Sequence, residues 1–101
     1  EQQAARQAAL TATTILAAEV PLGFATRCVR PHERLRELQA QGPAAMASDL
    51  TPAQALAQAG FRGARDNVRI NLDSLPETDA DRRRIALDLA HLEAAAPFSL
   101  D

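Results

Sequence analysis

The stretch EQQAARQAALTATTILAAEV, residues 1–20, decides the fold because it is rich in alanine and contains neither proline nor glycine. Alanine has the highest intrinsic helix propensity of all residues. We therefore predict a helix that packs through small side chains, and we expect PLG at residues 21–23 to end it, because proline lacks the backbone donor. The residues expected on its inner face, at helical spacing, are Ala5, Ala8, Ala12, Ile15 and Leu16.

The rest of the chain predicts further helices. Pro31 fits a first helical position, and Gly42 with Pro43 gives a stop. Thr51 fits an N-cap before Pro52, and Gly60 is expected to end that short helix. Pro97 follows the last helix, after which Phe98 and Leu100 are expected to fold back as an apolar tail. The expected segments are about 31–41, a turn over 44–49, 51–60, 64–72 and 75–95.

These segments predict an all-α fold, a compact bundle of four or five helices in a single domain over residues 1–101. The apolar fraction is 47%, but 23 residues are alanine and only 22 are leucine, isoleucine, valine or phenylalanine. The core of large side chains is therefore thin, and such a chain gains from burying a face against a partner. Because the chain opens on Glu1 and not on methionine, we expect it to be excised from a longer protein.

Composition limits the class of protein. A net charge of -2 argues against a self-repelling disordered coil. No apolar run approaches the roughly 18 residues of a membrane-spanning helix, so we expect a soluble protein without a membrane span. No signal peptide is visible, and the location stays open between cytoplasmic and translocated. The single Cys28 excludes an internal disulfide.

All 11 basic residues are arginine and lysine is absent. Codon bias in a GC-rich bacterial genome is one interpretation. The other is a lysine-free effector or toxin module that avoids lysine-directed modification in a host cell.

The segment LDSLPETDADRRR, residues 72–84, is best explained as a helix start. Ser74 and Glu77 have the S-x-x-E spacing of a capping box, with Thr78 as a competing N-cap. Asp79 and Asp81 would then lie at the positive end of the helix dipole. The three arginines that follow have no structural role in this interpretation.

The triplet DSL at residues 73–75 resembles the attachment motif of acyl carrier proteins, which would imply a phosphopantetheine arm on Ser74. In that family, a long loop precedes the serine and a further helix follows the next one. This chain departs from the pattern on both sides, so a carrier domain modified at Ser74 is kept only as an alternative.

No complete metal, catalytic or phosphate-binding site can be assembled from the sequence. Cys28 and His32 are two candidate zinc ligands, and His91 beside Asp88 could add a third, but proline separates the first two. A calcium loop starting at Asp79 lacks the required glycine. No nucleophile with its base and no phosphate-binding glycine loop can be assembled. We therefore expect no cofactor, no metal and no catalytic residue.

The leading hypothesis is a non-catalytic helical interaction domain, of bacterial origin, that docks onto a partner protein. An alternative is an anion or nucleic-acid binding module, although the acidic balance disfavours nucleic acid. Comparison of residues 52–70 with a helix-turn-helix fails at two positions. The candidate partner-binding residues for either hypothesis are Arg82, Arg83 and Arg84, with Arg62, Arg65 and Arg69 as a second stripe.

Overall fold

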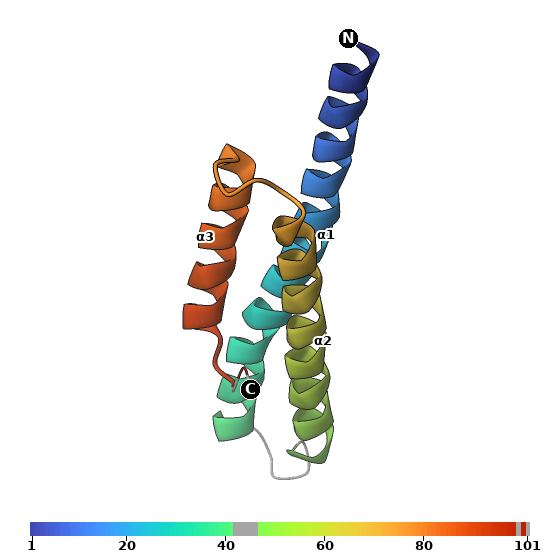
Figure 1. Cartoon of the computed structure of the whole chain (residues 1–101). Helices are drawn as coiled ribbons and strands as arrows, with labels where there is room; N and C mark the ends of the chain where they lie inside the picture. The colour runs from blue at the N-terminus through green and yellow to red at the C-terminus, as the bar shows by residue number, and fades with distance from the viewer. Residues whose placement is uncertain (42–46, 99, 101) are drawn as a thin grey trace.

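The protein is a three-helix structure in the part of the chain that the computed structural model describes, residues 1–41, 47–98 and 100. The side chains of residues 32, 33, 35, 39 and 47–49 lie outside that description. Helices α1 (Gln2–Gln41) and α2 (Ala47–Asp73) form a long antiparallel hairpin, and α3 (Ala80–Ala95) packs along it (Figure 1). Helix is the only regular structure in these ranges. The all-α class is confirmed, and the expectation of four or five helices is wrong.

Predicted helices merge where breaks were expected. The segments 1–20 and 31–41 belong to α1, which contains both Pro21 and Pro31. The segments 51–60 and 64–72 belong to α2, which begins at Ala47 and passes through Gly60. An internal glycine costs a helix about 1 kcal/mol, which packing along a long hairpin offsets. Of the turn expected over 44–49, residues 44–46 lie outside the described residues.

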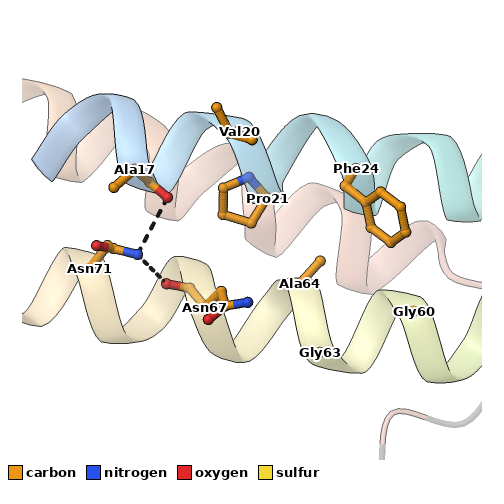
Figure 2. A pocket seen from close by; sticks show the side chains of 9 residues that line it. All are labelled: Ala17, Val20, Pro21, Phe24, Gly60, Gly63, Ala64, Asn67 and Asn71. Atoms are coloured by element: carbon orange, nitrogen blue, oxygen red, sulfur yellow. Dashed lines mark hydrogen bonds between the residues drawn. The ribbon is translucent and has the colours of Figure 1, made fainter. Parts of the chain in front are cut away.

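Helix α1 continues through Pro21, and α2 supplies a hydrogen bond to the carbonyl that Pro21 leaves without its usual donor. Proline has no amide to donate to the carbonyl four residues earlier, here that of Ala17. The side-chain amide Nδ2 of Asn71 donates to the Ala17 carbonyl at 3.3 Å and to the Asn67 carbonyl at 2.8 Å (Figure 2). The carbonyl released by Pro21 therefore has a partner from the neighbouring helix.

Asp79 is the N-cap of α3. Its backbone is extended, and its carboxylate accepts a hydrogen bond from the amide of Arg82 at 2.9 Å. The last helix thus begins at Ala80 and not near residue 75, and Thr78 is not its cap. Asp81 lies in the first turn, at the positive end of the helix dipole as expected.

Ser74 belongs to the end of α2 and not to the start of α3, so the predicted capping box with Glu77 is wrong. The Ser74 amide donates to the Asn71 carbonyl at 3.2 Å, and the Leu75 amide donates to the Leu72 carbonyl at 2.9 Å. These bonds use carbonyls that α2 leaves free at its C-terminal end.

Two apolar clusters hold the helices together. The tail expected to fold back does so, and the rings of Phe61 and Phe98 meet edge to face, with centroids 5.5 Å apart and planes at 69°. The first cluster buries Ala18, Val68, Leu72, Leu75, Ile85 and Leu89. The second buries Ala25, Cys28, Val29, Phe61 and Ala64 beneath Leu92, Ala96, Phe98 and Leu100.

The molecule is elongated, with extents of 64 × 19 × 19 Å. Its radius of gyration is 17.3 Å, whereas a compact domain of this length has about 13 Å. The N-terminal part of α1 extends beyond α2 and α3 (Figure 1), and residues 1–10 are all exposed. The bundle is therefore less compact than the sequence suggested, and the prediction that Ala5, Ala8, Ala12 and Leu16 lie on an inner face is wrong, because all four are exposed.

The role of Asn71 is testable by a double-mutant cycle with Pro21. Asn71→Ala should lower the free energy of unfolding by about 1 kcal/mol, because the Ala17 carbonyl loses its partner. In a Pro21→Ala background, residue 21 donates its own amide to that carbonyl, so the same substitution should cost less. Urea denaturation followed by circular dichroism measures all four proteins. Equal costs in both backgrounds would show that Asn71 does not compensate for Pro21.

Candidate functional site

A groove of about 620 Å³ lies between α1 and α2. All of its lining residues come from these two helices (Figure 2), while α3 packs against neighbouring positions such as Ala18 and Val68. The groove therefore opens on surface that α3 leaves uncovered. Its lining consists of Ala17, Val20, Pro21, Phe24, Gly60, Gly63, Ala64, Asn67 and Asn71.

Two glycines of α2 shape the groove in different ways. A Cβ atom at Gly60 would lie 3.1 Å from Cε1 of Phe24 and 3.2 Å from Sγ of Cys28, so α1 and α2 approach closely there. A Cβ atom at Gly63 would meet nothing within 4 Å. Gly60 thus serves the packing of the hairpin, whereas Gly63 leaves room that a second molecule can enter.

The groove is apolar and uncharged. On its rim, Val20 is 67% exposed and Phe24 is 49% exposed. Its polar groups are the amides of Asn67 and Asn71, and the second of these already bonds Ala17. None of the lining residues is ionisable, so the groove suits an apolar surface and offers no acid, base or nucleophile.

Arg82 and Arg83 contact the connection between α2 and α3. Arg82 donates to the Leu75 carbonyl and lies 4.0 Å from a carboxylate oxygen of Asp73. Nε of Arg83 donates to the Glu77 carbonyl at 3.2 Å. Both side chains therefore hold the loop before α3.

Arg84 links α3 to α1. Its Nη2 donates to Glu19 at 2.5 Å and to Asp81 at 3.2 Å. The hydrogen bonds to Glu19 and then to Asp81 raise the pKa of Arg84 above its ordinary value. The expectation that these three arginines have no structural role is wrong, while their role in binding a partner stays a prediction.

The second arginine stripe lies at the other end of α3. Nη1 of Arg65 donates to the Leu100 carbonyl at 2.7 Å, and Nη2 of Arg69 bonds both carboxylate oxygens of Glu93 at 3.0 and 3.1 Å. Arg62 is half-buried on the same helix. The two predicted stripes are therefore not brought into one site.

The other candidates for chemistry are dispersed. Cys28 is buried, as expected for a small apolar residue, and burial raises the pKa of its thiol above the ordinary value of 9.0. Its suggested partner His32 has a side chain outside the described residues. His91 is exposed beside a small hollow that Asp88 also lines. Among the described residues, no group of three histidines, cysteines or acids could hold a metal ion.

The sequence did carry a signal for the groove. Gly60, Gly63, Asn67 and Asn71 recur at spacings of three and four, which places small and amide side chains along one face of a helix. An interpretation of Gly60 as a helix stop divides this face between two helices.

Helix α1 also meets the length and composition expected of a membrane span. The segment Gln2–Leu38 contains an 18-residue window with a mean hydropathy of 1.5, and 11% of that window is buried. Core helices of soluble proteins and signal sequences satisfy the same criterion, so this is weak evidence. The expected absence of a membrane span stays a prediction.

The groove lies in the part of the chain that matches a known protein family. The family model described as Formiminotransferase-cyclodeaminase matches residues 1–86. The chain belongs to the formiminotransferase-cyclodeaminase family. The residues matched to this family include all of α1 and α2 and therefore the whole groove, whereas His91 lies outside them. No curated protein and no solved structure matches the chain.

The two groove glycines should respond differently to alanine. Gly63→Ala should raise the free energy of unfolding by about 0.5–1 kcal/mol, because alanine favours the helix and its Cβ meets open space. Gly60→Ala should lose that gain, because its Cβ presses on Phe24 and Cys28. Gly23→Ala, also with open space around its Cβ, is the control and should resemble Gly63→Ala. Thermal or urea unfolding measures the difference, and equal gains at all three positions would contradict close packing at Gly60.

Burial of Cys28 predicts a stability that falls in alkaline solution. The unfolded thiol ionises near its ordinary pKa, whereas the folded thiol, with its raised pKa, stays neutral. The contribution of Cys28 is therefore complete below the ordinary pKa and is lost as the pH rises toward the folded value. Urea unfolding between pH 7 and pH 10 should show a steeper decline for the wild type than for Cys28→Ala. Parallel declines would contradict the shift.

Proposed function

We propose that this chain is a helical interaction module whose α1–α2 groove receives an apolar helix of a protein partner. The observation that carries the proposal is the open, uncharged groove on surface that α3 leaves uncovered. Binding of an apolar helix face in a groove between helices is a common mode of peptide recognition. The proposed role is binding and not catalysis.

The shape of the groove supports a helix as the ligand. Gly63 and Ala64 present little or no side chain at the floor, and the distance between packed helices depends on the side chains at their contact. Val20 and Phe24 stand at the rim, where they would cover the sides of an inserted helix. A neutral lining also spares both partners the cost of desolvating a charge.

None of the candidate arginines lines the groove. Arg82, Arg83 and Arg84 make intramolecular contacts that also hold α3, so their removal would alter stability as well as binding. Docking therefore rests on the groove. Bacterial origin and an effector role stay predictions from composition.

A second candidate function comes from the family. Its description joins formiminotransferase and cyclodeaminase, and the match covers the whole groove. In an enzyme of that kind, the amides of Asn67 and Asn71 could bind a polar ligand group, although neither amide is an acid or base at neutral pH. Ammonia release from a formimino compound by the purified chain, reduced by Asn67→Ala, would favour this function.

Filling the groove should abolish helix binding without unfolding the protein. Gly63→Leu places a side chain in the open space above Gly63, so it should preserve the helical circular dichroism spectrum and remove the docking surface. Display selection of a helical peptide library on the wild type, with counter-selection on Gly63→Leu, should recover amphipathic peptides. If no peptide separates the two proteins, the groove does not bind helices.

A further inference from the structure

We propose that a cavity between α1 and the connection from α2 to α3 binds a small aliphatic amine in its protonated form. The cavity has a volume of about 420 Å³, which is within the range of small-molecule sites in proteins. It shares no lining residue with the α1–α2 groove, so this inference is independent of the proposed function.

Two parts of the chain that are distant in sequence form the cavity. Gln7, Thr11 and Thr14 follow one another at spacings of four and three on α1, which places them on one face of the helix. Residues 74–76 and Asp79 form the opposite wall, between the end of α2 and the start of α3. The cavity therefore exists because this connection lies against α1.

One carboxylate gives the cavity its charge. Of the described residues that line it, Asp79 alone is ionisable. Asp79 forms no ion pair within the part of the chain that the structure describes. The amide of Arg82 donates to its Oδ1 at 2.9 Å, which orients the carboxylate and leaves it further acceptor sites. A cation in the cavity would thus meet a negative charge that no described side chain neutralises.

The hydroxyl of Thr14 can only accept a hydrogen bond from a ligand. Its proton is donated to the Leu10 carbonyl at 2.9 Å. Asp79 likewise accepts and does not donate, so two groups of the lining require a donor. Thr11 and Ser74 add hydroxyl oxygens that can also accept. Several acceptors around one carboxylate suit an ammonium group, which has three donors and no acceptor.

Apolar side chains beside these acceptors suit an alkyl chain. Leu10 is 52% exposed and lines the cavity together with Pro76 and the buried Leu75. An alkyl chain that covers Leu10 removes apolar surface from water, which an inorganic cation cannot do. A single carboxylate also falls short of a metal site, and the described residues contain no group of three histidines, cysteines or acids. The lining therefore favours an aliphatic amine over a metal ion.

The neighbouring arginines hold the wall of the cavity and do not line it. Arg82 donates to the Leu75 carbonyl, and Nε of Arg83 donates to the Glu77 carbonyl at 3.2 Å. These bonds fix the connection against which the ligand would lie. A wall that is fixed in advance lowers the entropy cost of binding.

Titration with butylamine tests the site. At neutral pH and low ionic strength, we expect the wild type to bind it with a dissociation constant of about 1 mM, as is usual for so small a ligand. Nuclear magnetic resonance should locate the shifted resonances at Thr11, Thr14 and Ser74. 1-Butanol has the same alkyl chain without the charge and should bind at least about tenfold more weakly. No binding of butylamine, or equal binding of both compounds, would overturn the proposal.

Asp79→Asn removes the charge and keeps the helix cap, because asparagine and aspartate are equally good N-caps. This variant should retain the circular dichroism spectrum of the wild type and bind butylamine about tenfold or more weakly. Asp88→Asn is the matched control, since it removes the same charge from α3 at a residue outside the cavity, and it should bind like the wild type. Unchanged binding in Asp79→Asn, or equal losses in both variants, would mean that the amine does not bind at this carboxylate and would refute the inference.

Two adjacent threonines provide a second matched pair. Oγ1 of Thr13 donates to the Ala9 carbonyl at 2.9 Å, as that of Thr14 does to the Leu10 carbonyl, but only Thr14 lines the cavity. Thr14→Val should weaken butylamine binding about threefold to tenfold, because one acceptor is lost, whereas Thr13→Val should leave it unchanged. Both substitutions keep a β-branched side chain in α1, so their effects on the helix are alike. Equal affinities of the two variants would place the amine outside this cavity.

Discussion

The continuity of α1 past Pro21 is the constraint on which the rest of the structure depends. A break at that position would release the N-terminal half of the helix and separate the residues that line one wall of the groove. The side chain of Asn71 bonds the Ala17 carbonyl that Pro21 leaves without its helical donor, and Gly60 permits the close approach of α1 and α2 a few turns away. One hydrogen bond and one missing Cβ atom therefore bring α1 and α2 together on either side of Pro21.

Three arginines connect the helices and the C-terminal tail. Arg84 joins α3 to α1, Arg69 joins α2 to Glu93 of α3, and Arg65 holds the C-terminal tail through the Leu100 carbonyl. Exposed ion pairs of this kind contribute little each, about 0–1 kcal/mol. The two apolar clusters must supply most of the stability, and the arginines orient the short α3 and the tail on the hairpin.

The sequence was sufficient to predict features that depend on local composition. It was not sufficient where a residue distant in the chain determines the local structure. Alanine content and apolar spacing were enough to predict helices and the folded-back tail. Continuity through Pro21 could not be predicted, because the compensating group lies 54 residues from Ala17 in the chain. The sequence places the start of α3 too early because Ser74 and Asp79 both satisfy local capping rules, whereas in the structure Asp79 is the cap and Leu75 packs into the first cluster. An interpretation of Gly60 as a helix stop divides α2 and separates the residues that line one wall of the groove.

A thin core and an open groove have a common physical origin. Alanine forms helices readily but buries little apolar area, so a chain with this composition can make a 40-residue helix without having enough large side chains to cover it. The large apolar residues gather around α3 and the tail, which leaves Leu16, Val20 and Phe24 exposed on α1. Surface of that kind is stabilised when a second helix covers it. The composition that allows so long a helix is therefore also what leaves part of its surface uncovered.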